Sequence, residues 1–336
     1  MRITILAAVL AWVQVPSVAP AANGLEIIWV DVEGGAATLI VTPAGESLLM
    51  DCGWPLARDA ERIKQAAERA RVKKIDHLLT SHWHSDHFGG IEELVKRIPV
   101  KKFYDHGFPE ANAPDIDPKL KESYLRITGG KSAVLKPGDT IPLTGVTVKI
   151  LASHGSVIGE EPGGPQTRWC QANPEHPARP DDVSDNFRSL AFLLSVGEFD
   201  FFNSGDLSWN VEHKLVCPAN LVGTVDVYQV SHHGSDANPA VFGAVQPTVA
   251  VVNNGARKGG DARTFKSLRE TPGLKDIFQL HRSLASVPAD NAPPKFVAND
   301  EETCPGAWIK LTVDASGKSY AVEVPSKGTK LKYACK

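Results

Sequence analysis

The sequence lacks a strong excess of charge of either sign and any repeated low-complexity pattern. Its 36 Lys and Arg residues against 39 Asp and Glu residues give a formal net charge of −3 at pH 7. This balance excludes a globally basic coat for nucleic acid. Glycine (28 residues) and proline (24 residues) predict many turns but follow no collagen-like period. A chain of 336 residues that is 42% hydrophobic and 22% charged has the composition of a folded globular protein.

Long apolar runs are also missing, except at the start. Residues 3–15 are almost wholly apolar, they follow Arg2, and small residues including Ala19 and Ala21 come after them. This order is typical of a secretory signal peptide over residues 1–21, which we expect to be cleaved after Ala21. The run is shorter than the roughly 20 residues that span a bilayer. We therefore expect an exported protein, periplasmic or secreted, whose mature chain has no membrane span.

Cysteine is scarce, and the five residues leave at least one thiol without a partner. Export favours disulfides. Cys304 and Cys335 bracket the C-terminal strands and are the first expected pair, with Cys170 and Cys217 as a second. Cys52 ends an apolar run, so we expect it to be a buried free thiol.

The order of the elements predicts a single domain over residues 22–336. Two β-branched runs, 25–32 and 37–41, predict a hairpin, and strands then alternate with helices in both halves. This pattern predicts two sheets sandwiched between helices. Residues 155–185 are rich in Pro, Gly and charge, which predicts a long functional loop. Residues 308–324 predict a C-terminal β-hairpin extension.

The strongest local signal is a string of metal-binding side chains at residues 82–87. It directly follows a strand predicted over residues 75–80, and its four donors are His82, His84, Asp86 and His87. Imidazole nitrogens and carboxylate oxygens suit Zn²⁺ or a similar ion. Three imidazoles on one polar loop would otherwise repel one another or stay unsatisfied. The string therefore predicts a metal site, in which Asp86 and His87 can serve a second ion beside the first.

Two later strand ends carry further donors. Asp206 follows Gly205 at the end of an apolar strand, where its two carboxylate oxygens can bridge two cations. The strand over residues 225–230 is followed by His232 and His233. One imidazole of this pair can ligate a metal while the other donates to substrate or acts as a general acid. We assign His232 to the metal and His233 to catalysis, and the reverse assignment stays open at this stage.

Together these features resemble the metallo-β-lactamase superfamily. The resemblance is carried by His-x-His-x-Asp-His with the Gly-Gly after it, Asp51 in an Asp-x-Gly turn, Asp206 and the late His, and it spans about residues 25–324. It implies a four-layer αββα sandwich with the metal site at its edge, and Asp51 as the residue that orients a ligand His. The His-His-Gly-Ser string, with Asn186 and Ser189, resembles more specifically the hydrolase domain of ComEC-type competence proteins and the related phosphorylcholine esterases.

The sequence departs from the family pattern at one ligand position. The family usually supplies another His before the strand that leads to the bridging Asp, and that position is Asp185 here. Three alternatives remain at this stage. Asp185 ligates through oxygen, water fills the position, or His154 or His176 takes it.

A Gly-rich turn after the next predicted strand is the expected substrate-binding segment. Arg and Lys in such a turn favour an anionic group, although a plain surface turn explains the same residues. Its candidate residues are Asn253, Asn254, Arg257 and Lys258. Lesser candidates for the pocket wall are Asp105, His106 and His281.

The residues and the resemblance together predict an exported metal-dependent hydrolase. We expect two Zn²⁺ ions, with Mn²⁺ or iron as alternatives, and a metal-activated hydroxide as the nucleophile. Asp86, Asp206 and His233 are the expected catalytic residues, and the expected substrate is a phosphoester or a similar anionic ester. A lactone, β-lactam or other acyl substrate is the alternative within hydrolases. An iron-dependent redox enzyme and a non-catalytic nucleic-acid binder are alternatives of other classes. We expect a monomer without a stable nucleic-acid complex.

Overall fold

The computed structural model describes residues 24–109, 113–159, 168–170 and 179–336. The expected signal peptide lies outside the described residues, as do His176 and much of the predicted loop at 155–185. Across the described ranges, no helix combines the length and the apolar character that crossing a membrane requires.

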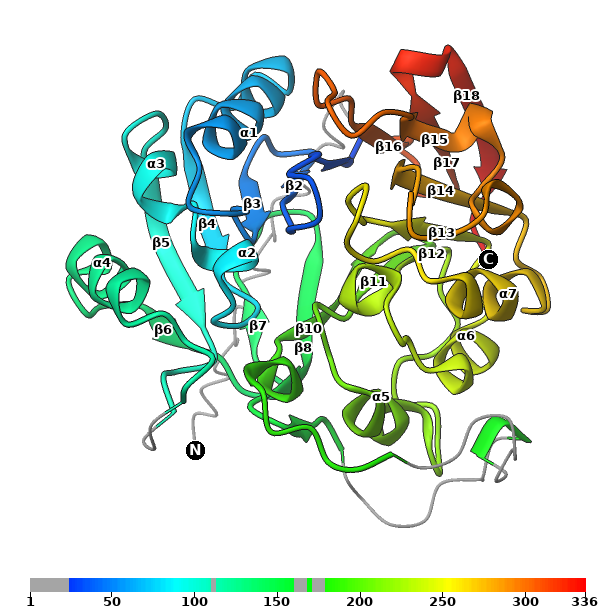
Figure 1. Ribbon diagram of the computed structural model, residues 1–336, viewed down its shortest axis with the longest axis horizontal. Coiled ribbons are helices and arrows are strands. Elements are labelled where there is room, and N and C mark those ends of the chain that lie inside the picture. Colours follow the sequence, from blue (N-terminus) through cyan, green and yellow to red (C-terminus); the bar gives the residue numbers. More distant parts are fainter. Residues whose placement is uncertain (1–23, 110–112, 160–167, 171–178) are drawn as a thin grey trace, which may run out of the picture.

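Two large sheets form the centre of the molecule (Figure 1). The first has the order β18-β17-β16-β1-β2-β3-β4-β5-β6. Its strands are β1 (Glu26–Trp29), β2 (Thr38–Val41), β3 (Ser47–Met50), β4 (Ile75–Leu79), β5 (Val100–Asp105), β6 (Ala133–Val134), β16 (Ile309–Val313), β17 (Ser319–Val324) and β18 (Thr329–Ala334). It is antiparallel from β18 to β3 and parallel from β3 to β6.

The second sheet has the order β15-β14-β13-β12-β11-β10-β8-β7, and β9 pairs with β8. Its strands are β7 (Thr140–Ile141), β8 (Thr147–Ser153), β9 (Ser156–Val157), β10 (Ala191–Val196), β11 (Phe199–Asn203), β12 (Val227–Gln229), β13 (Val249–Val252), β14 (Asp276–His281) and β15 (Val297–Asn299). From β11 to β15 the strands are parallel. The carboxyl ends of these strands therefore meet at one edge of the sheet.

Helices cover the outer faces of both sheets (Figure 1). The first sheet carries α1 (Ala57–Arg69), α2 (Ser85–Phe88), α3 (Ile91–Val95) and α4 (Pro118–Thr128), and the second carries α5 (Trp209–Val216), α6 (Pro239–Val245) and α7 (Ala262–Arg269). The expected four-layer αββα sandwich is thus confirmed.

Alternation along β1 shows why one sheet can serve two cores. Ile27 and Trp29 belong to the larger apolar core that includes Phe201 of the second sheet. Ile28 points to the opposite face and joins the core that includes Ile63 of α1. Successive side chains of a strand point to opposite faces, so β1 contributes apolar side chains to both cores.

The C-terminal strands extend the expected hairpin and rule out one of the two expected disulfides. The predicted hairpin exists as β16 and β17, but β16 also pairs with β1, and β18 adds a third strand. The expected Cys304–Cys335 disulfide is wrong: both cysteines are free, because β16, β17 and β18 carry Cys335 to the opposite end of the sheet. The bond that forms joins Cys170 and Cys217, whose Cα atoms are 5.4 Å apart. Cys52 is buried and free, as expected.

One buried carboxyl on α5 makes the stability of the fold depend on pH. Glu212 is 1% exposed, and it accepts hydrogen bonds from the Tyr228 hydroxyl (3.1 Å) and the Asn238 backbone N–H (2.9 Å). Burial raises the pKa of Glu212 to about 8, although these hydrogen bonds oppose the shift. The folded chain therefore holds this proton at pH values where the unfolded chain has lost it.

We predict that Glu212→Gln removes a fall in stability as pH rises from 5 to about 8. Since the folded pKa lies above the unfolded value, the wild-type free energy of unfolding should decrease across this window, by on the order of a few kcal/mol. Urea unfolding at pH 5 and pH 8 measures the difference between the two proteins. Glu68→Gln, at a glutamate whose side chain is 59% exposed, should retain the wild-type slope. An equal slope in the Glu212→Gln variant would contradict the assignment.

Candidate metal centre

The loop after β4 presents the histidine string at the edge of the sandwich. β4 ends at Leu79, and Asp86 and His87 lie on the short helix α2. The two glycines that follow are required by packing. A Cβ atom on Gly89 would lie 2.1 Å from the Ser85 carbonyl oxygen, and one on Gly90 would lie 2.0 Å from that of Cys52. Only glycine lets the loop close this tightly against its neighbours.

The second sheet supplies the other donors from two strand ends. Asp206 follows β11, and His232 and His233 follow β12. Both histidines have positive φ angles, 51° and 54°. Side chains other than glycine rarely adopt this left-handed conformation, and such strain is often found at functional sites. The turn thereby aims the two adjacent imidazoles in different directions.

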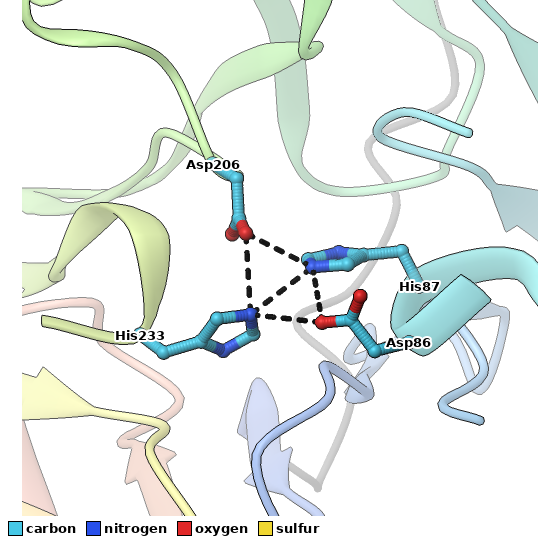
Figure 2. A group of neighbouring side chains, drawn as sticks. All are labelled: Asp86, His87, Asp206 and His233. Atoms are coloured by element: carbon cyan, nitrogen blue, oxygen red, sulfur yellow. Dashed lines mark hydrogen bonds and ion pairs between the residues drawn. The ribbon is translucent and has the colours of Figure 1, made fainter. Parts of the chain in front are cut away.

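Four side chains from the two halves of the chain meet in one buried cluster (Figure 2). Nε2 of His87 lies 3.1 Å from Oδ2 of Asp206 and 3.2 Å from Oδ2 of Asp86. Nε2 of His233 lies 3.2 Å from each of the same two oxygens. The two Nε2 atoms are 3.1 Å apart. Two carboxylates and two imidazoles that converge in this way are a donor set that suits a transition-metal ion.

Asp51 orients one of these imidazoles. Its Oδ2 lies 2.8 Å from Nδ1 of His87, which leaves Nε2 facing the cluster. The same carboxylate accepts hydrogen bonds from the Ser81 backbone N–H and hydroxyl, each 2.7 Å long. Sequence reasoning proposed Asp51 for this task but missed Ser81, which ties Asp51 to the start of the histidine loop. Such partners fix the tautomer of a ligand histidine.

His82 and His84 lie beside the four-residue cluster rather than within it. The His82 ring centroid is 4.0 Å from that of His87 and 4.6 Å from that of His84. His82 is fully buried, and within the described part of the chain its Nε2 has no hydrogen-bond partner. An uncompensated buried nitrogen is costly, and a metal ion would compensate it. Nε2 of His84 lies 3.1 Å from Oδ2 of Asp115.

The ionisation of these groups follows from burial and from their neighbours. Burial lowers the pKa of His82 well below its usual value, so its lone pair is available to a cation. Burial alone would raise the pKa of Asp206, but His233 and His87 hold it well below its usual range. The pKa of Asp86 is lowered in the same way, against burial, by His87 and His233.

Asp185, at the position where the family usually has histidine, is committed to other partners. Its Oδ2 accepts a hydrogen bond from the Trp83 backbone N–H (2.7 Å) and lies 3.1 Å from Nε2 of His106, while Arg188 donates to Oδ1 (3.2 Å). The structure therefore does not bring Asp185 into the four-residue cluster, and uses it to brace the histidine loop. His154 also lies outside the cluster, with its ring 5.7 Å from that of His106.

The structure gives the two adjacent histidines different neighbours. His233 belongs to the cluster, and its Nδ1 lies 3.3 Å from the Asn253 backbone oxygen. His232 instead has its Nε2 3.4 Å from the amide nitrogen of Asn186. It lines a neighbouring cavity together with Arg179 and other residues.

The expected substrate turn splits into residues that face the cluster and residues that do not. Lys258 contacts Oδ2 of Asp86 and lies over the Trp54 ring, 5.3 Å from its centroid. Arg257 points away, pairs with Glu302 and has a side chain that is 72% exposed.

The two asparagines of the turn each take part in a contact with a backbone carbonyl oxygen. The carbonyl oxygen of Asn253 lies 3.3 Å from Nδ1 of His233. The side-chain amide of Asn254 donates a hydrogen bond to the carbonyl oxygen of His281 (2.9 Å). Asn254 thus fixes the turn to the end of β14, a role that the sequence alone did not indicate.

Comparisons with known proteins agree with this architecture. Residues 30–160 match the family model described as Metallo-beta-lactamase superfamily. ComE operon protein 3 of Bacillus subtilis is 24% identical over 250 residues, which are 68% of this chain and 28% of that protein. An atrochrysone carboxyl ACP thioesterase of Aspergillus terreus is 28% identical over 85 residues, 25% of this chain and 26% of that protein.

Among solved structures, the metallo-beta-lactamase fold protein YhfI from Bacillus subtilis is 13% identical, with a TM-score of 0.46. The match covers 78% of this chain and 98% of that one.

The resemblance to the metallo-β-lactamase superfamily is thereby confirmed. The family match includes Asp51 and the histidine string but ends before Asp206 and His233, which the geometry brings to the same site. This chain spans only about a quarter to a third of the length of the curated relatives that it matches.

We predict that Asp51→Asn weakens metal binding by about 10- to 100-fold, because it removes the charged acceptor that orients His87. Asparagine tolerates the left-handed conformation of residue 51, whose φ is 62°, so the backbone should be retained. Competition with a chromogenic chelator measures the Zn²⁺ affinity. Asp76→Asn replaces a buried carboxylate whose partners are Ser47 and Lys101, and should leave the affinity unchanged. Equal affinities for the two variants would refute the role of Asp51.

Proposed function

We propose that this metallo-β-lactamase-fold chain is an exported metal-dependent hydrolase that acts on a phosphoester or a similar anionic ester. The observation that carries the proposal is the convergence of Asp86, His87, Asp206 and His233 in one buried cluster at the edge of the sandwich. Like charges and buried imidazoles gathered in this way are characteristic of a catalytic metal centre.

The donor set fits a metal, with Zn²⁺ preferred and Mn²⁺ or iron as alternatives. The four clustered residues would hold it together with His82, whose buried Nε2 otherwise has no partner in the described structure. His84 lies beside His82 and completes the set. Two carboxylates and four imidazoles are enough donors for two ions. When bound, such ions supply hydroxide at neutral pH and stabilise the charge that develops on the ester.

The protein's own contribution is to position these donors and to handle protons. Asp51 and the Asn253 carbonyl oxygen each take the Nδ1 side of one imidazole, so that Nε2 of His87 and His233 face inward. His232 lies beside the cluster and lines the adjacent cavity, where its imidazole can donate a proton to the leaving group. His233 is then a ligand rather than the general acid.

Lys258 supports an anionic substrate. Its ammonium group lies against Asp86 on the rim of the cluster, within reach of a phosphate oxygen that enters the site. A compact point charge in a glycine-rich turn is a common means of binding phosphate. An acyl ester or thioester is the second candidate, favoured by the similarity of part of this chain to a thioesterase.

We predict that Asp206→Ala loses both metal and activity. Asp206 contacts both clustered imidazoles, so its removal should lower the metal content per chain and abolish hydrolysis of bis-p-nitrophenyl phosphate. Elemental analysis and a colorimetric assay measure the two effects. Asp200→Ala, on β11 shortly before Asp206 and hydrogen-bonded to Ser195, is the control and should behave as wild type. Wild-type activity in the Asp206→Ala protein would refute the proposed function.

We predict that Lys258→Ala distinguishes the two substrate classes. Loss of the ammonium group should raise KM for an anionic phosphodiester by about tenfold, while hydrolysis of a neutral thioester should change little. Steady-state kinetics with both substrates measures this difference. Arg257→Ala changes the neighbouring cation, which is paired with Glu302, and should leave both reactions unaffected. Activity confined to the thioester would favour the acyl alternative.

A further inference from the structure

A second group of metal-binding side chains lies apart from the candidate metal centre. Asp31 follows β1, His281 is the last residue of β14, and Cys304 lies between β15 and β16. Asp31 and His281 are fully buried, and Cys304 is half-buried. One donor atom from each lies within 4.8 Å of the others. None of the three has a part in the proposed hydrolysis.

The three side chains converge on one point instead of forming a relay. Nε2 of His281 lies 3.0 Å from Oδ1 of Asp31 and 3.6 Å from Sγ of Cys304. Sγ of Cys304 lies 3.2 Å from Oδ2 of Asp31. A nucleophile–histidine–carboxylate triad uses both ring nitrogens, one for each partner. Here both partners meet Nε2, and Nδ1 has no hydrogen-bond partner in the described part of the chain.

We propose that Asp31, His281 and Cys304 bind a divalent transition-metal ion of the zinc class. Ligand distances of about 2.0 Å for nitrogen or oxygen and about 2.3 Å for sulfur place the ligands of a tetrahedral zinc ion about 3.3–3.6 Å apart. Two of the observed separations share Nε2 of His281 and lie close to this range: 3.0 Å to Oδ1 of Asp31 and 3.6 Å to Sγ of Cys304. The third, 3.2 Å, joins Sγ of Cys304 to the other Asp31 oxygen, Oδ2. Thiolate, imidazole and carboxylate together are a donor set that selects zinc over calcium or magnesium.

The charges around the site are compatible with such an ion. Binding of the dication displaces the thiol proton of Cys304 and any proton on His281, so Asp31 and the thiolate balance its two positive charges. Arg62 donates to Oδ2 of Asp31 (2.9 Å) and to Sγ of Cys304 (3.8 Å), and it also pairs with Glu33 (3.1 Å), which offsets part of its charge from outside the site. Three protein ligands leave the fourth position to water or to an external ligand.

The position of the site suggests what the ion would do. Asp31 extends from the first sheet and His281 from the second, so one ion would join the two sheets at their edge. The His281 backbone oxygen also holds Asn254, in the turn that carries Lys258. By fixing His281, the ion would therefore stabilise the turn that carries Asn254 and Lys258.

Cobalt substitution of the full chain, with the Cys170–Cys217 disulfide intact, tests this site. The candidate metal centre contains no sulfur ligand, so a thiolate-to-cobalt charge-transfer absorption in the near ultraviolet reports a cysteine site. We expect this band in the wild-type protein and its loss in Cys304→Ser. Zinc-saturated Cys304→Ser should also hold one ion fewer per chain than wild type.

The matched control is Cys335→Ser, which alters the other half-buried free cysteine and should keep both the band and the ion. Circular dichroism establishes that each variant is folded, and His281→Gln, which keeps the thiol, should weaken the band. The proposal is overturned if the cobalt-saturated wild type has no thiolate band, or if the band and ion count persist in folded Cys304→Ser. Neither result depends on whether the chain hydrolyses an ester.

Discussion

The buried meeting of two carboxylates and two imidazoles is the constraint on which this structure depends. Asp86 and His87 come from the first sheet's side, and Asp206 and His233 come from the second. All four are 4% exposed or less, where an unpaired charge is costly. The two sheets must therefore pack in one register, since a shift of either would leave these groups buried without partners.

Much of the surrounding hydrogen bonding supports this cluster. Asp51 and the Asn253 carbonyl oxygen orient the two imidazoles, and Ser81 ties Asp51 to the histidine loop. Asp185 braces the same loop through the Trp83 backbone and His106. A centre held on several sides by buried polar contacts is preorganised, which is what catalysis by a positioned metal requires.

The candidate functional residues lie at one edge of the sandwich because the strand ends meet there. Parallel strands β11 to β14 bring their carboxyl ends to one rim. The turns there carry Asp206, His233 and Lys258, and β14 ends in His281. The turn with Lys258 contacts the candidate metal centre on one side, and through Asn254 the end of β14 on the other. This arrangement links the proposed catalytic centre to the proposed cysteine-containing site.

The sequence by itself determined the features whose residues are neighbours along the chain. The histidine string lies within six residues, directly after a strand, so a metal site could be predicted there without a fold. Alternating apolar runs and strand–helix order were likewise enough to predict the sandwich, because burial imposes the period of each element locally.

Tertiary structure decided everything that depends on separation in the chain. It left Cys304 and Cys335 unpaired, because the C-terminal strands carry Cys335 away from Cys304, while the second expected pair, Cys170 and Cys217, forms a disulfide. It selected His233 over His232 through a left-handed turn that no local pattern predicted. It turned Asp185 toward His106, and it brought together Asp31, His281 and Cys304 from distant segments. These outcomes rest on directions and distances across packed sheets, which residue types and spacing do not encode.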